Sequence, residues 1–172
     1  MKFGIIKERK NPPDRRVVFT PEELVRLQSE HPEAEIKVES SDIRIFSDDQ
    51  YRNLGLNVTT DVSDCDVLFG VKEVPVDALI PNKKYFFFSH TIKKQPYNRK
   101  LLQAILAKNI ELYDHETIVN ASNHRLIGFG RYAGLVGAYN GFRGFGIKYD
   151  LFTLPKPETL SAKEDLIARL KR

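Results

Sequence analysis

The chain has 172 residues, of which 41% are hydrophobic and 29% are charged, a balance typical of one globular domain with a sizeable core. Lys and Arg number 27 against 23 Asp and Glu, and this dispersed excess is too small for a dedicated nucleic-acid binder. Cys65 is the only cysteine, which excludes a disulfide framework and CxxC motifs. The longest apolar stretch, around residues 133–139, is far too short to cross a bilayer. We therefore expect a cytoplasmic protein with no membrane or nucleic-acid partner.

Short apolar segments alternate with amphipathic segments along the chain. The predicted strands cover residues 3–7, 35–38, 58–60, 66–71, 84–89 and 110–113. The stretches Thr20-Pro21-Glu22-Glu23 and Ser47-Asp48-Asp49-Gln50 are capping boxes, which mark helix starts. The predicted helices run from about residue 20 to 29, from 47 to a stop at Gly55, and over 97–108. This alternation predicts an α/β fold of flavodoxin- or Rossmann-like type, with a mostly parallel sheet and helices on both faces.

Glycine is concentrated near the end of the chain, where seven of the ten glycines lie between residues 128 and 146. Their spacing fits neither GxGxxG nor GxxxxGK[ST], and no clean strand precedes them, so we expect no cofactor-binding loop. Pairs such as Gly130 and Gly134 instead form a smooth stripe on one helix face, which permits close approach of another backbone. This stripe is a candidate surface for homo-oligomer formation.

The sequence changes character from Leu154 onward. Pro155-Lys156-Pro157 is typical of a linker, and Ser161-Ala162-Lys163-Glu164 is a third capping box that opens a helix. We therefore divide the chain into a catalytic and substrate-binding domain, 1–153, and a linker with the start of a helix, 154–172. The second part is expected to lead into a domain that lies outside this chain.

Charged side chains follow four of the predicted strands. They are Arg9, Lys10, Asp14, Arg15 and Arg16 after the first strand, Lys72 and Glu73, His90 and Lys93, and Asp114 and Glu116. Because ligands bind outside the carboxyl ends of strands in open parallel sheets, this edge is the candidate site. The four histidines have no metal-ligand spacing, so no metal site is expected.

Each of these groups also has an ordinary structural interpretation. Lys72 and Glu73 are a solvated turn pair or, alternatively, a lysine that binds a substrate carbonyl or carboxylate beside a tuning acid. His90 is a structural residue at the end of an apolar strand or a general acid/base. Arg16 is surface charge or a carboxylate clamp. Residue types alone leave both interpretations open.

Several motifs resemble the amino-terminal domain shared by alanine dehydrogenases, proton-translocating transhydrogenases and saccharopine dehydrogenases. The general motifs are Gly4-Ile5-Ile6-Lys7-Glu8, Arg16, Thr20-Pro21 and Gly70-Val71-Lys72-Glu73-Val74-Pro75. Three stretches resemble the lysine-ketoglutarate reductase and lysine-forming saccharopine dehydrogenase branch in particular: Tyr85–Lys93, Leu112–Glu116 and Gly128–Gly134. The resemblance runs from about Phe3 to Gly146.

The resemblance implies a reversible condensation of an amino acid with a 2-oxo acid by hydride transfer. Lys72 and His90 match the catalytic proton-transfer groups, and Arg16 matches an arginine that holds a substrate carboxylate. The remaining matches are substrate-binding or tuning residues: Glu73, Lys93, Glu116 and Arg125. These matches fall on or near the strand ends that the topology alone selects.

The family's cofactor is NAD or NADP, and the resemblance implies that a second domain, not found in this chain, binds it. The chain alone is therefore expected to be inactive as a dehydrogenase. Two alternatives remain: an alanine dehydrogenase-type domain acting on pyruvate and ammonia, and a stand-alone small-molecule-binding module without catalysis. A third, less favoured, is an inert interaction domain that dimerises through the glycine stripe.

Overall fold

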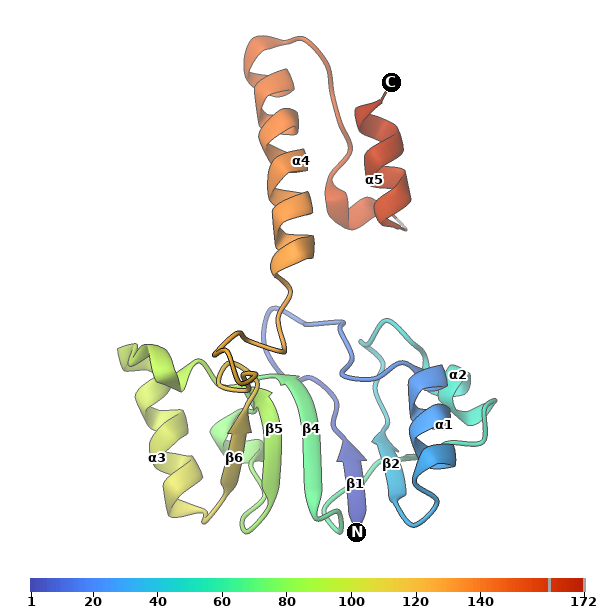
Figure 1. The fold of residues 1–172 in the computed structure, drawn as a ribbon, viewed down its shortest axis with the longest axis vertical. Coiled ribbons are helices and arrows are strands. Elements are labelled where there is room, and N and C mark those ends of the chain that lie inside the picture. The colour runs from blue at the N-terminus through green and yellow to red at the C-terminus, as the bar shows by residue number, and fades with distance from the viewer. Residues whose placement is uncertain (161, 172) are drawn as a thin grey trace. The chain divides into compact units, whose positions relative to one another are not determined.

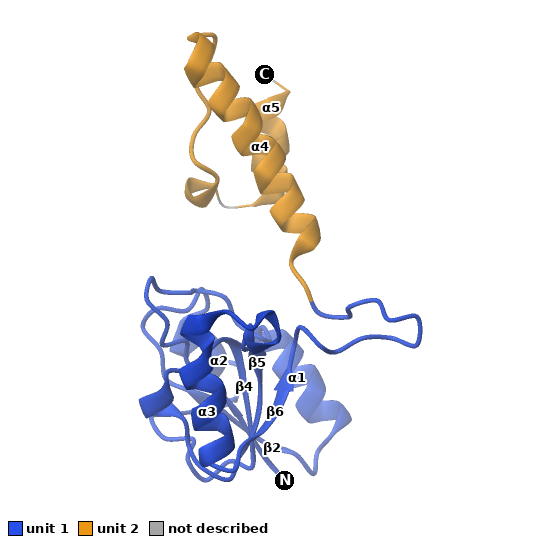
Figure 2. Cartoon of the chain, turned by 90° about the vertical axis from the view of Figure 1, so that its left-hand side faces the viewer, with its two compact units in different colours: residues 1–127 blue, residues 128–172 orange. Residues whose placement is uncertain are grey.

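The computed structural model describes residues 1–160 and 162–171, which form two compact units, 1–127 and 128–172 (Figures 1 and 2). The six strands of unit 1 are β1 (Lys2–Ile5), β2 (Glu35–Glu39), β3 (Asn57–Thr59), β4 (Val67–Lys72), β5 (Lys84–Phe88) and β6 (Glu111–Asp114). Its α-helices are α1 (Pro21–Glu30), α2 (Asp48–Arg52) and α3 (Arg99–Ala107). Unit 2 contains α4 (Gly130–Tyr149) and α5 (Lys163–Leu170).

All six strands pair in parallel, in the order β3-β2-β1-β4-β5-β6. The chain therefore builds the sheet outward from β1 to β3, returns to the centre at β4, and builds outward again to β6. The predicted parallel α/β sheet is confirmed. Neighbouring β1 and β4 form the topological switch point, where the connections that follow them diverge and leave a crevice at the carboxyl edge.

Two apolar cores lie on the two faces of the sheet, because successive strand residues point to opposite sides. On one face, Leu68 and Phe87 pack with Leu101 of α3. On the other, Ile5 and Val38 pack with residues of α1 and α2. Figure 1 shows α3 beside β5 and β6, and α1 and α2 beside β2. The prediction of helices on both faces is therefore confirmed.

The capping signals locate helix starts well. At α1, the Thr20 hydroxyl accepts the Glu23 N–H at 3.3 Å, and the Glu23 carboxylate accepts the Thr20 N–H at 2.8 Å. The short helix after Ser47 ends at Arg52, and Gly55, at φ 79°, reverses the chain. That positive φ is the conformation for which glycine is the usual residue.

Three predicted boundaries are wrong by a few residues. The first strand ends at Ile5, not residue 7, because Glu8 turns toward β4. The helix predicted over 97–108 begins at Arg99, after a 3₁₀ turn, Pro96–Asn98. The helix α5 begins at Lys163, since the carboxylate of Asp165, not of Glu164, accepts the Ala162 N–H at 3.1 Å. The predicted cap Ser161 lies outside the described residues.

The glycine-rich helix α4 belongs to unit 2. Buried Tyr139 donates to the Pro155 carbonyl at 3.1 Å, and Arg143 donates to the Leu154 carbonyl at 3.0 Å. A Cβ at Gly146 would lie 2.5 Å from the Phe152 carbonyl oxygen, so this position requires glycine. The compact units therefore divide at residue 127, before α4, whereas the predicted functional boundary is at 153. The functional boundary, and self-association through the glycine stripe, stay predictions.

Candidate functional site

The connection after β1 carries Arg16, which forms an ion pair with Asp14. The Arg16 side chain donates from Nε to the Asp14 carboxylate at 2.9 Å. This hydrogen bond is the main cause of the lowered pKa of Asp14, which burial opposes. The pair holds the guanidinium in one orientation while part of it stays exposed, with 40% of the Arg16 side chain accessible. An arginine held in this way suits bidentate binding of a carboxylate.

Glu8 anchors the end of β4 from the neighbouring connection. Its two carboxylate oxygens accept the N–H groups of Val71 at 2.7 Å and Lys72 at 2.9 Å. The register of β4 against β5 shifts between Phe69 and Lys72, which frees these N–H groups from the ladder. Burial raises the pKa of Glu8, and the two backbone hydrogen bonds partly oppose that rise. Glu8 therefore fixes the backbone from which the Lys72 side chain projects.

Lys72 lies half-buried at the end of β4. Its ammonium group has no hydrogen bond or ion pair with any side chain in the described part of the chain, although Asp14 lies close enough to feel its charge. A half-buried ammonium group that lacks a partner within the fold is poised to bind an added acceptor. This geometry favours the ligand-binding interpretation of Lys72 over the solvated turn pair.

Glu73, the next residue, faces a different partner. Its Oε1 forms an ion pair with Lys10, while its buried Oε2 has no hydrogen-bond partner among residues 1–160 and 162–171. Burial, the largest single influence, opposes ionisation, but the Lys10 hydrogen bond, a backbone hydrogen bond and the charges of Lys10 and His90 together outweigh it and leave the pKa of Glu73 lowered. Glu73 is thus an ionised carboxylate, and one of its oxygens has no hydrogen bond among the described residues. It directly follows Lys72 at the end of β4, next to the strand β5 that leads to His90.

His90 and Glu116 meet across the ends of β5 and β6. His90 Nδ1 lies 3.0 Å from Glu116 Oε2 and 3.0 Å from Lys93 Nζ. When Nδ1 carries a proton, it donates to the Glu116 carboxylate; when it does not, it accepts from the Lys93 ammonium. Nδ1 therefore forms only one of these two hydrogen bonds at a time. The other ring nitrogen, Nε2, has no hydrogen bond within residues 1–160 and 162–171 and is available to an added group. This arrangement gives an imidazole oriented by a carboxylate, as in many general acid/base sites.

Glu116 is the centre of this second cluster. Its side chain is 8% exposed, with Lys93 Nζ 3.1 Å and Arg125 Nη1 4.0 Å from Oε1. Burial opposes ionisation, but the hydrogen bonds and the charges of His90 and Lys93 together outweigh it, so the pKa of Glu116 is lowered. An antiparallel bridge between Val119 and Arg125 returns the arginine to the site. One carboxylate facing two cations leaves net positive charge for an anionic ligand.

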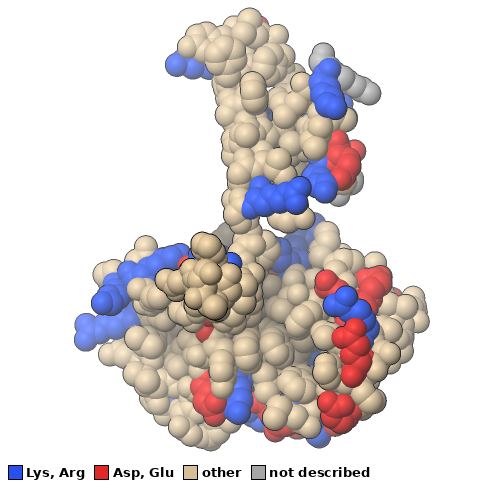
Figure 3. Space-filling model, in the orientation of Figure 1, with Lys and Arg blue, Asp and Glu red and all other residues tan. Residues whose placement is uncertain are grey.

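All seven predicted site residues lie in unit 1, at or beside the carboxyl edge of the sheet, in two clusters. The first contains Arg16, Lys72 and Glu73; the second contains His90, Lys93, Glu116 and Arg125. The charge of His90, in the second cluster, contributes to the lowered pKa of Glu73, in the first. Figure 3 shows Lys and Arg gathered on the side of unit 1 where α3 lies, and mixed with Asp and Glu elsewhere.

Sequence reasoning missed residues that hold the site together. Lys10 and Asp14 were noted as charges after the first strand, but their pairing with Glu73 and Arg16 was not predicted. Glu8 lay within a motif but had no role. Its signal was an acid directly after a buried strand at the centre of the sheet, next to the connection that carries the site.

The first crossover of the sheet does not fit the pyrophosphate of a nicotinamide dinucleotide. The first crossover helix, α1, has no glycine loop before it, and its N-terminus carries Glu22 and Glu23, which would repel a pyrophosphate. No group of His, Cys, Asp and Glu within the described ranges could hold a metal ion. No helix in those ranges is long and apolar enough to span a membrane.

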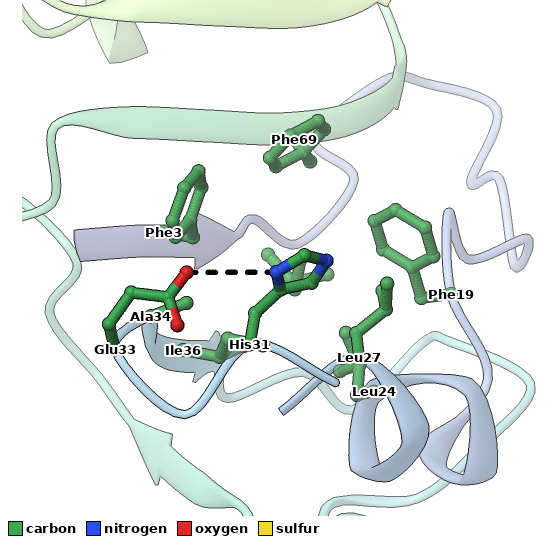
Figure 4. Close-up of a pocket in the computed structure, with 10 residues that line it drawn as sticks. Phe3, Phe19, Leu24, Leu27, His31, Glu33, Ala34, Ile36 and Phe69 are labelled. Carbon is green, nitrogen blue, oxygen red and sulfur yellow. Dashed lines mark ion pairs between the residues drawn. The ribbon is translucent and has the colours of Figure 1, made fainter. Parts of the chain in front are cut away.

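An apolar pocket lies away from the carboxyl edge, between α1 and the sheet (Figure 4). Phe3, Phe69 and Leu27 line it, and His31 and Glu33, 3.6 Å apart, lie at one side. None of the seven predicted site residues lines this pocket. The charged edge therefore remains the candidate site.

A buried histidine beside the site predicts acid sensitivity. His115 Nε2 lies 3.1 Å from the Gly70 carbonyl oxygen, and burial lowers the pKa of His115, which that hydrogen bond only partly opposes. Because the folded pKa lies below the ordinary 6.5, the unfolded chain binds the proton first as pH falls. Stability is therefore lost from about pH 6.5 downward until the folded pKa is reached.

The substitution His115→Phe removes the titrating group from this position. Urea unfolding at about pH 7.5 and about pH 5.5 should show a smaller difference in unfolding free energy for this variant than for the wild type. The exposed control His124→Phe should keep the wild-type difference. An equal difference in His115→Phe would mean that other groups cause the acid sensitivity.

Comparisons with known proteins identify the family and the fold. Residues 4–136 match the family described as alanine dehydrogenase/PNT, N-terminal domain. The alpha-aminoadipic semialdehyde synthase of Arabidopsis thaliana is 36% identical over 147 residues, which are 83% of this chain and 14% of that protein. The lysine-forming, NAD(+)-type saccharopine dehydrogenase of Yarrowia lipolytica is 26% identical over 80% of this chain and 40% of that protein. This chain thus spans less than half of either relative.

A solved structure of L-alanine dehydrogenase has the same fold, with a TM-score of 0.63 and 18% identity, over 88% of this chain and 42% of that one. Dehydrogenases are thus found both among the proteins similar in sequence and among those similar in fold. The family match, residues 4–136, extends over most of unit 1 and the first part of α4. The predicted resemblance is confirmed, and the chain belongs to the alanine dehydrogenase/PNT N-terminal domain family.

Proposed function

We propose that this chain is the substrate-binding and proton-transfer domain of an NAD(P)-dependent amino-acid dehydrogenase of the saccharopine dehydrogenase or lysine–2-oxoglutarate reductase type. The observation that carries the proposal is the pair of clusters at the carboxyl edge: Lys72, whose ammonium has no side-chain partner among the described residues, and His90 oriented by Glu116. The identity to the Arabidopsis synthase favours this branch over the alanine dehydrogenase branch. The dinucleotide would be bound by protein outside this chain.

The first cluster suits the common part of the substrates. A 2-oxo acid carries a carboxylate beside a carbonyl, and an arginine and a lysine can bind these two groups together. Arg16, steadied by Asp14, would hold the carboxylate, and Lys72 would donate to the carbonyl oxygen. The ionised carboxylate of Glu73, beside Lys10, would attract the ammonium of the amino acid through its negative charge.

The second cluster suits proton transfer and a second negative charge. Joining an amine to a ketone requires a proton donor for the departing water and an acceptor for the amine proton. His90 Nε2 would perform one of these transfers while Glu116 holds Nδ1. Lys93 and Arg125 are about half exposed, with 47% and 50% of their side chains accessible, and would meet the distal carboxylate of a dicarboxylic acid.

Affinity for two 2-oxo acids tests this assignment. Titration calorimetry on the 172-residue chain should show tighter binding of 2-oxoglutarate than of pyruvate, because only the former has a carboxylate for Lys93 and Arg125. The double variant Lys93→Ala, Arg125→Ala should lose about threefold to tenfold in 2-oxoglutarate affinity, a modest effect since both side chains are partly screened by water, and should leave pyruvate unchanged.

The control Lys84→Ala removes a lysine at the opposite end of β5, where it pairs with Glu111 at 3.7 Å. It should bind both acids like the wild type. Equal affinity of the wild type for the two acids would favour the alanine dehydrogenase-type alternative. Binding of neither acid would contradict the proposed substrates and leave a module for another ligand.

A further inference from the structure

Two buried polar side chains lie beneath His90 and Glu116 and have no role in the proposed chemistry. Ser89 is fully buried and Asp114 is 7% exposed. The Ser89 hydroxyl donates to Asp114 Oδ2, and Asp114 Oδ1 accepts the Glu116 N–H at 2.9 Å. One carboxylate therefore bonds both the turn after β5 and the turn after β6.

The Ser89 hydroxyl also fixes the residue after His90. Its oxygen accepts the Thr91 N–H at 3.1 Å and lies 2.8 Å from the Thr91 hydroxyl. His90 itself has φ 58°, in the left-handed region that is unfavourable for a residue other than glycine. Such a conformation persists only where its surroundings impose it. The bonds on both sides of His90 supply that constraint.

We propose that Asp114, acting through Ser89 and the Glu116 backbone, is a positioning residue that holds His90 and Glu116 at hydrogen-bonding distance. Its two oxygens bond different turns, so the spacing of those turns is set before any ligand arrives. Ser89 is no nucleophile here, because its hydroxyl faces the buried carboxylate and not the open edge. That this positioning serves catalysis rests on the proposed function. The positioning of His90 and Glu116 by Asp114 does not depend on it.

The titration of Glu116 reports the positioning directly. In the wild type, the hydrogen bonds and the charges of His90 and Lys93 together outweigh burial and lower the pKa of Glu116. In Ser89→Ala and Asp114→Asn, a loosened His90 turn should weaken those bonds, and the pKa of Glu116 should rise. Carbon-detected NMR of the carboxyl group, without ligand, measures this shift. A merely structural role in stability would leave the titration of the folded variants unchanged.

An exposed serine–aspartate pair offers a matched control. Ser63 donates to Asp61 at 3.1 Å in the turn before β4. The variants Ser63→Ala and Asp61→Asn remove the same kinds of group and should leave the Glu116 titration as in the wild type. The expected result is therefore a shift in the buried pair of variants and none in the exposed pair.

Amide exchange in the wild type tests the same arrangement without any substitution. The N–H groups of Thr91 and Glu116 should be protected as long as Ser89 and Asp114 accept from them. Rapid exchange of both would overturn the proposal even if Asp114→Asn and Ser89→Ala fail to fold. An unshifted Glu116 pKa in folded variants would overturn it as well.

Binding of 2-oxoglutarate separates this proposal from the proposed function. If both hold, the variants should bind it more weakly, on the order of tenfold, because misplaced groups lose much of their effect. If the wild type does not bind it but the Glu116 titration still shifts, the substrate assignment fails and the positioning stands. If the wild type binds 2-oxoglutarate and the variants titrate Glu116 like the wild type, the positioning role is overturned and the substrate assignment stands.

Discussion

Replacing Lys72 by Met should weaken the binding of 2-oxo acids by about 10- to 100-fold, which corresponds to the roughly 1.5–3 kcal/mol of a hydrogen bond to a charged group. Methionine keeps an unbranched apolar side chain of similar length but removes the charge. No partner of the Lys72 ammonium lies within the described residues, so its removal leaves no buried charge unpaired, and the fold should be unaffected. Titration calorimetry with 2-oxoglutarate, and thermal unfolding by circular dichroism, measure the two effects.

The matched control is Lys84→Met, which makes the same change at the opposite edge of the sheet. It should bind 2-oxoglutarate like the wild type. If Lys72→Met also bound like the wild type, Lys72 would lie outside the binding site, and the proposed role of the switch point would have to be abandoned. If Lys72→Met lost both binding and thermal stability, the lysine would have a structural role that the geometry does not show.

Local signals explain which elements were predicted correctly. The capping box at Thr20 involves residues three apart, so the helix start is encoded within one turn of chain. The apolar run ending at Phe88 is buried at most positions, so its composition identifies a strand. The charges after these strands share an edge because parallel strands all end there. The position of the candidate site therefore followed from local pattern combined with topology.

Contacts between distant residues explain what could not be predicted. Glu8 bonds Val71 and Lys72, more than sixty residues away, and only because β1 and β4 are neighbours with a shifted register. The bond from Ser89 to Asp114 likewise needs β5 and β6 side by side. Neither the strand order nor the register shift is encoded in a local motif, so an acid or serine at these positions looks like an ordinary loop residue.

Replacing Phe87 by Ala should lower the free energy of unfolding of unit 1 by about 3–5 kcal/mol. Phe87 is completely buried in the core beneath α3, where its ring meets Tyr85 edge-on at 5.9 Å. Alanine removes the whole ring, and the neighbouring strands, bonded on both sides of β5, can close little of the cavity. Urea unfolding followed by circular dichroism measures the loss, and exposed Tyr97→Ala, which is 70% accessible, should cost far less.

The cooperativity of urea unfolding shows whether the cores on the two faces of the sheet unfold together. Leu24→Ala makes a cavity in the opposite core, under α1, where Leu24 is 1% exposed. Both cores share β1 and β4, so both variants should shift one common transition with an unchanged urea dependence. A second transition in Phe87→Ala alone would mean that the β4–β5–β6 half unfolds separately. The His90 and Glu116 cluster, together with Lys72 at the end of β4, would then be lost before Arg16, which follows β1.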